Sequence, residues 1–242
     1  MFQQYFTLWG MTLTAAILEL FFYFSRRTRY SISCSELFAI ILIIGIGSPV
    51  GASLASIIVQ GYASGKRAYG MILLTTMLLL PYAAYRKSKD GRLTDYAALP
   101  ALSICCAGKI QCCFDHCCYG IALFETESGK IIRFPSEILE TITLFAMLFW
   151  LLDLERKEKA KSFLWPLYAL WYGITRYVAD LFRGNPKELK AFLFGIRPGQ
   201  FWSIVIILMG FWLLGKAFKR KYGRDLEGKE LLQAIIGKFP ET

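Results

Sequence analysis

The stretch from Gly108 to Gly120 combines more reactive side chains than any other part of the chain. Its thirteen residues include a lysine, an aspartate, the only histidine and four of the seven cysteines. Ionisable groups in or beside hydrocarbon are costly and usually mark a functional site, and this stretch ends an apolar run. Cysteine and histidine at helical spacing are compatible with zinc or redox chemistry, whereas small cysteines are also typical packing residues of membrane helices. We expect packing for most of these cysteines and an anionic partner for Lys109.

A second group of polar residues lies in a later apolar run. Tyr172, Arg176, Asp180 and Arg183 follow one another at intervals of four, four and three residues, which places them on one face of a helix. The planar donor fork of arginine matches two phosphate oxygens at once, and Asp180 can orient the guanidinium groups. The pattern predicts a phosphate-binding surface. Two alternatives are a salt bridge that only joins helices, and an Arg183 that only extends to the membrane interface.

Two further polar residues stand at expected helix starts. Glu140 lies in a helix that begins after Pro135, where an acidic residue stabilises the positive end of the helix dipole. Its functional interpretation is that it orients a basic group across the bundle. Gln200 follows Pro198 and Gly199 and either makes a hydrogen bond at the outer interface or only begins the last helix.

Apolar runs must position these groups. The chain of 242 residues is 55% hydrophobic, and its apolar residues come in blocks of about 17–25, enough to cross a bilayer. The blocks are Tyr5–Tyr23, Leu37–Val59, Tyr69–Tyr85, Ile138–Leu154, Leu164–Phe182 and Phe201–Phe218, with a seventh, interrupted span at Tyr96–Cys118. We predict an all-α polytopic membrane protein with one transmembrane domain at residues 1–218 and a short amphipathic cytoplasmic tail at 219–242. The polar segment Phe124–Pro135 is predicted to be a loop.

The net charge of +10 follows the membrane topology rather than a nucleic-acid surface, because the basic residues gather in alternate loops. This positive-inside pattern places the N-terminus outside and the C-terminus in the cytoplasm, with an odd number of spans. No basic residue precedes the first run, so we expect a membrane span there rather than a cleaved signal peptide. We expect a lipid bilayer as partner and no nucleic acid.

Four segments together resemble the prolipoprotein diacylglyceryl transferases in order and spacing. They are GK at 108–109 with Gly120, FPSEILE at 134–140, YGITRY at 172–177 followed by DLFR at 180–183, and GQ at 199–200. The resemblance covers roughly residues 45 to 215. It implies an enzyme of the bacterial inner membrane that takes phosphatidylglycerol from the bilayer. The diacylglyceryl group passes to the lipobox cysteine of a prolipoprotein, glycerol 1-phosphate leaves, and no metal or organic cofactor is needed.

The resemblance also implies roles for single residues. Arg176 matches the family's important arginine, and Asp180 and Arg183 match the acid and the arginine that follow it, with aspartate in place of glutamate. Lys109 stands where the family has an arginine. Glu140 and Gln200 match the family's glutamate and glutamine at those places.

The chain departs from the family at the group expected to activate the thiol. The family's His-Gly-Gly motif has no match, and Tyr69 and Gly70 stand at the best placement. Tyrosine, with a usual pKa of about 10, is a poor base at neutral pH, and His116 is the other candidate. We therefore keep two alternatives: a diverged relative that uses another acceptor or binds phospholipid without catalysis, and a Cys/His metal or redox membrane protein.

Overall fold

Each of the seven apolar runs lies largely within a helix in the computed structural model of the chain. The structure describes residues 2–61, 68–88, 91–115, 118, 120–157, 160–184 and 196–240. The long helices are α1 (Phe2–Tyr30), α2 (Cys34–Gln60), α3 (Ala68–Tyr85), α4 (Arg92–Asp115), α5 (Ser136–Arg156), α6 (Leu164–Leu181) and α8 (Pro198–Tyr222). By length and composition, α2, α3 and α8 are the helices of the described part that are apolar enough to cross a membrane. The protein is therefore mostly helical, and the count of seven spans and their direction remain predictions.

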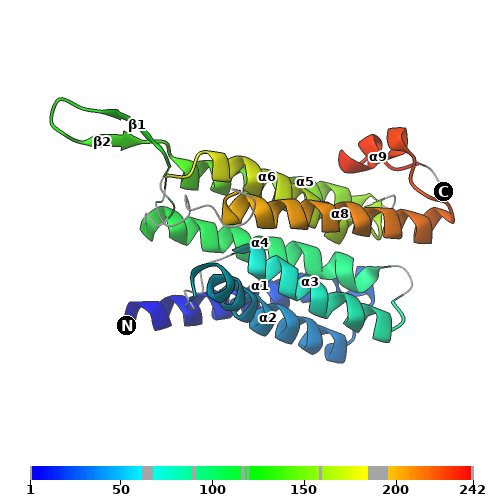
Figure 1. Cartoon of the computed structure of the whole chain (residues 1–242). Coiled ribbons are helices and arrows are strands. Elements are labelled where there is room, and N and C mark those ends of the chain that lie inside the picture. The colour runs from blue at the N-terminus through cyan, green and yellow to red at the C-terminus, as the bar shows by residue number, and fades with distance from the viewer. Residues whose placement is uncertain are drawn as a thin grey trace.

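Helix α4 is the centre of the bundle. Figure 1 shows α1, α2 and α3 on one side of it and α5, α6 and α8 on the other. Its small residues Ala97 and Ala98 are fully buried, as are Leu99 and Leu102, so neighbouring helices approach it closely. The predicted interruption is wrong, because α4 continues through Pro100 and Lys109. Packing on both sides supports a helix across a proline that lacks one backbone hydrogen bond.

The segment predicted as a loop at Phe124–Pro135 is mostly a β-hairpin. Strand β1 (Ala122–Glu125) pairs antiparallel with β2 (Ile131–Arg133), and the hairpin projects beyond the bundle (Figure 1). The turn contains Gly129 at φ +77°, a backbone conformation that glycine adopts without steric cost. The fold is therefore helical with one small two-stranded sheet. Helix α5 begins at Ser136, which confirms the predicted helix start after Pro135.

The last part of the chain folds back onto the bundle. Helix α9 (Gly228–Ile235) follows α8, and the indole Nε1 of Trp171 donates to the Ile235 carbonyl at 2.8 Å. Beyond α9, the ring of Phe239 stacks on Phe163 with centroids 4.1 Å apart. Leu232 and Ile236, four residues apart, are exposed. The tail thus has a helix with one apolar side against the bundle and an apolar pair facing outward.

Candidate functional site

Glu140 lies at the centre of a buried cluster of charges. Its Oε1 accepts hydrogen bonds from Nη1 of Arg176 at 2.9 Å and from Nε and Nη2 of Arg183 at 2.8 and 2.6 Å. Its Oε2 forms an ion pair with Nζ of Lys109. All four side chains are buried. The structure therefore brings three predicted cations together around one carboxylate. Lys109 comes from α4, Glu140 from α5 and Arg176 from α6, and Arg183 lies just after α6 ends at Leu181.

A short set of backbone hydrogen bonds joins these three helices just outside the cluster. Gly120, after α4, donates its N–H to the carbonyl of Phe134 at 3.1 Å, and Ile121 donates to the carbonyl of Phe182 at 2.9 Å. Gly120 has no room for a side chain, because an added Cβ would meet the backbone of Phe134. The chain after α4 thus lies between the start of α5 and the end of α6. This arrangement fixes Lys109, Glu140 and Arg183 relative to one another.

Asp180 is attached to the same cluster but is not its centre. Its Oδ1 lies 3.8 Å from Nη2 of Arg176, and its side chain is 1% exposed. A Cβ at Gly199 would meet the Asp180 carboxylate, so this carboxylate lies against the first turn of α8, the positive end of that helix. The prediction that Asp180 orients the guanidinium groups fits Arg176, whereas Glu140 holds both arginines.

Gln200 has a local role in the start of α8. Its Oε1 accepts from the backbone N–H of Arg197 at 3.4 Å, three residues earlier, as in a capping box. The same Arg197 donates from Nη1 to the carbonyl of Asp180 at 3.0 Å. The observed geometry of Gln200 is that of a helix start beside the cluster, and its predicted substrate contact remains a prediction.

Two tyrosines of α6 precede Arg176, and cysteines of α4 lie nearby. Tyr172, one turn before Arg176, is 2% exposed, and no hydrogen-bond partner for its hydroxyl occurs among the described residues. The hydroxyl of Tyr168, a further turn away, lies 3.4 Å from Sγ of Cys105 on α4. Cys106 is buried in the core, and Sγ of Cys113 lies 3.3 Å from the Thr141 hydroxyl. These three cysteines therefore contact neighbouring helices, as the packing interpretation predicts.

Of the two candidates for thiol activation, Tyr69 lies among the described residues and His116 does not. Tyr69, at the start of α3, is buried and stacks on Trp202 of α8 with ring centroids 5.9 Å apart. It therefore packs against the same first turns of α8 that contact Asp180. His116 lies outside the described residues. Within the part of the chain that is described, no three His, Cys, Asp or Glu side chains are grouped to hold a metal ion.

The electrostatics of the cluster favour an anion. Three cations, Lys109, Arg176 and Arg183, face two carboxylates, Glu140 and Asp180, so these five groups have one excess positive charge. Such a charge is costly in a buried place unless an anion neutralises it. Because the guanidinium groups are already held by Glu140, they lose little conformational freedom when an anion arrives. The arrangement can therefore hold a phosphate group and stabilise charge that develops on it.

A second polar cluster, which the sequence interpretation did not find, lies at the other end of the bundle. The carboxylate of Glu155, near the end of α5, accepts from Nε of Arg26 at 2.7 and 2.8 Å and from the Tyr30 hydroxyl at 2.9 Å. Glu36 forms a comparable pair with Arg92. The sequence indicates only that these arginines belong to basic loops, because their acidic partners are 129 and 56 residues away.

Comparison with known proteins gives the same family that the sequence segments suggest. The family model described as prolipoprotein diacylglyceryl transferase matches residues 3–215. A phosphatidylglycerol–prolipoprotein diacylglyceryl transferase of Acinetobacter baylyi is 31% identical over 104 residues, which are 41% of this chain and 37% of that protein. One of the same name from Rhodospirillum centenum is 30% identical over 97 residues, 38% of this chain and 35% of that protein. The chain thus aligns with little more than a third of the length of these curated relatives.

Proposed function

Since the chain belongs to the prolipoprotein diacylglyceryl transferase family, we propose that it moves a diacylglyceryl group from phosphatidylglycerol to the lipobox cysteine thiol of a prolipoprotein. In this reaction the thiol loses its proton and its sulfur forms a bond to the terminal glyceryl carbon. The bond between that carbon and the phosphate oxygen breaks, and glycerol 1-phosphate leaves with one more negative charge. The proposed setting is the outer face of the bacterial inner membrane, with seven spans and the N-terminus outside.

The observation that supports this proposal is the convergence of Arg176, Arg183 and Lys109 on Glu140. The leaving phosphate gains charge as the carbon–oxygen bond breaks, and fixed cations at low dielectric stabilise that charge most strongly. Glu140 keeps the cations in place before the lipid arrives. In this proposal Arg176, Arg183 and Lys109 hold the phosphate, and Asp180 and Gln200 support this end of α6 and α8.

Activation of the acceptor thiol is the step for which Tyr69 and His116 remain the candidates. A thiolate is the nucleophile in such reactions, so some group must accept the thiol proton. Tyr69 packs on Trp202 at the start of α8. Gly199 of the same helix contacts Asp180, so α8 connects Tyr69 to the proposed phosphate site. Neutral tyrosine cannot itself accept this proton at neutral pH, which leaves room for the first alternative.

That alternative is a diverged relative that transfers the lipid-derived group to another acceptor, or that binds phospholipid without catalysis. Two substitutions favour it: lysine at 109 in place of the family's arginine, and tyrosine at 69 in place of its histidine. Both substitutions change side chains proposed to act near the reacting atoms, while the positive charge at position 109 is kept.

The test is release of glycerol 1-phosphate from phosphatidylglycerol by the purified protein, with and without a peptide that contains a lipobox cysteine. We expect release that depends on the peptide and is lost in Arg176→Ala, but kept in Arg156→Ala, an exposed arginine of α5 that serves as a matched control. Release without any peptide would point to a different acceptor. No release from folded protein would contradict transferase activity and leave lipid binding.

A further inference from the structure

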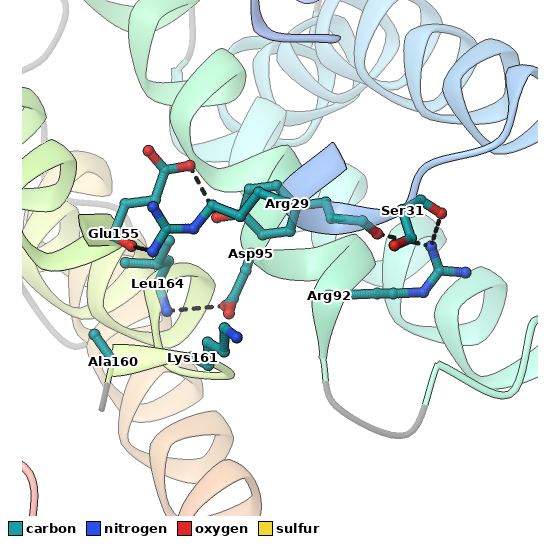
Figure 2. Close-up of a pocket in the computed structure, with 9 residues that line it drawn as sticks. Arg29, Ser31, Arg92, Asp95, Glu155, Ala160, Lys161 and Leu164 are labelled. Atoms are coloured by element: carbon teal, nitrogen blue, oxygen red, sulfur yellow. Dashed lines mark hydrogen bonds between the residues drawn. The ribbon is translucent and has the colours of Figure 1, made fainter. Parts of the chain in front are cut away.

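A cavity of about 210 Å³ lies at the end of the bundle opposite the Glu140 cluster. It is bordered by three cations, Arg29, Arg92 and Lys161, and by two carboxylates, Asp95 and Glu155. Figure 2 shows these side chains coming from α1, α4, α5 and the connection that leads into α6. The cavity therefore lies where four separate parts of the chain meet.

Both carboxylates of the cavity already have partners that hold them. Asp95 accepts the backbone N–H groups of Ser162 at 2.5 Å and Leu164 at 3.0 Å, which fixes the connection before α6. Glu155 accepts the guanidinium of Arg26 and the hydroxyl of Tyr30. Both carboxylates thus already hold other parts of the bundle together.

The cations that border the cavity differ in whether they have an acidic partner. Arg92 pairs with Glu36 at 2.5 Å, whereas Arg29 donates to the main-chain carbonyl of Glu155. Among the described residues, no carboxylate forms an ion pair with the Arg29 guanidinium. Lys161 adds a further positive charge to the border. The cavity thus has an excess of positive charge and a guanidinium with no acidic counterpart.

We propose that this cavity binds the phosphate of an anionic phospholipid from the leaflet at this end of the bundle. Basic pockets between membrane helices near the interface suit lipid headgroups, because the long basic side chains reach the phosphate level. Arg29 and Lys161 contact the phosphate from opposite sides of the cavity. The bound lipid joins α1 to the connection between α5 and α6. This site is separate from the Glu140 cluster and does not depend on transfer activity.

The experiment counts bound lipid by native mass spectrometry of protein released from detergent micelles that contain phosphatidylglycerol. It is carried out on Arg176→Ala protein, so that binding at the other end is removed. We expect the double variant Arg29→Gln/Lys161→Gln to bind the lipid about tenfold more weakly or worse, since charge-assisted hydrogen bonds are lost. The control Arg27→Gln/Lys157→Gln removes the same charge from exposed residues that do not border the cavity, and should stay within about twofold.

Three results would overturn the proposal. One is unchanged binding in the cavity variant, and another is an equal loss in the control, which would mean a general surface effect. The third is equal binding of phosphatidylcholine, which has no net charge. Displacement of the lipid by millimolar inorganic phosphate would reassign the site to free phosphate. Unfolding temperature and gel filtration of each variant, with Lys161→Arg as a rescue, separate loss of binding from loss of fold. Failure of the proposed transferase reaction would leave all these outcomes unaffected.

Discussion

The two ends of helix α5 carry carboxylates that are used in different ways. Glu140, near the start of α5, holds Lys109, Arg176 and Arg183, and all of these are buried. Glu155, near the other end, holds Arg26, whose side chain is 18% exposed, and the Tyr30 hydroxyl. An excess of buried cations is costly and gains little stability, whereas the partly exposed Arg26 can extend to water. The contrast suggests that the Glu140 end is kept for chemistry and the Glu155 end for holding helices together.

The largest expected effect is on transfer when Arg176 is removed. Arg176→Ala should lower the rate of peptide-dependent glycerol 1-phosphate release by about 100-fold or more, because it removes a fixed charge opposite the leaving phosphate. The protein should still insert and purify as a monodisperse species. Near-normal release would mean that the cluster only joins helices. The two ends of α5 would then have the same structural role.

The next largest effect is expected on stability when Glu140 is neutralised. Glu140→Gln leaves three buried cations with less counter-charge, and removal of one partner from a buried pair typically costs about 3–5 kcal/mol. The unfolding temperature in detergent should fall clearly, and transfer should fall with it. An unchanged unfolding temperature would show that water or lipid, rather than Glu140, neutralises the cations.

Glu155→Gln tests whether the two ends of α5 have different roles. We expect it to lower the unfolding temperature by less than Glu140→Gln does, because Arg26 is partly exposed and screened by solvent. Transfer per folded molecule should stay the same, since the change lies at the far end of α5. The measurement is the transfer rate below the unfolding temperature of both proteins. A loss of transfer as large as that of Glu140→Gln would contradict the division of roles.

Within the Glu140 cluster, the smallest effect is expected from Lys109→Arg. Lys109→Arg should keep transfer within about tenfold of the parent, because the charge stays and a bidentate fork is added, whereas Lys109→Ala should lose much more. Rates for both variants against the unaltered protein decide this. Equal rates for arginine and alanine would make Lys109 structural.

The sequence predicts most of the helices and part of the site. Long apolar blocks predict each long helix, because length and hydropathy are local properties. Helical periodicity alone predicts that Arg176 and Arg183 lie close together, although α6 ends at Leu181, just before Arg183. The hairpin was missed because its two strands have only four and three residues, and the glycine and charges between them indicate a loop equally well.

The pairing of distant residues could not be predicted in the same way. Glu140 is predicted to orient one basic group, but its three partners come from segments on both sides of it in the sequence. The ion pair of Arg26 with Glu155 joins residues 129 positions apart, and the basic residues there serve equally well as topology signals. Such contacts depend on how whole helices pack, which a single sequence does not specify.

The order of the cluster's members along the chain has a consequence for biogenesis. Synthesis proceeds from the N-terminus, so Lys109 on α4 emerges before Glu140 on α5, and Arg176 on α6 and Arg183 just after it come last. A lone charge in the bilayer costs several kcal/mol, so the lysine can neutralise the glutamate while the ribosome is still producing α6. We therefore expect Lys109 to act as a temporary counter-ion during insertion, and Lys109→Ala to lower the yield of integrated protein even where the finished bundle tolerates it.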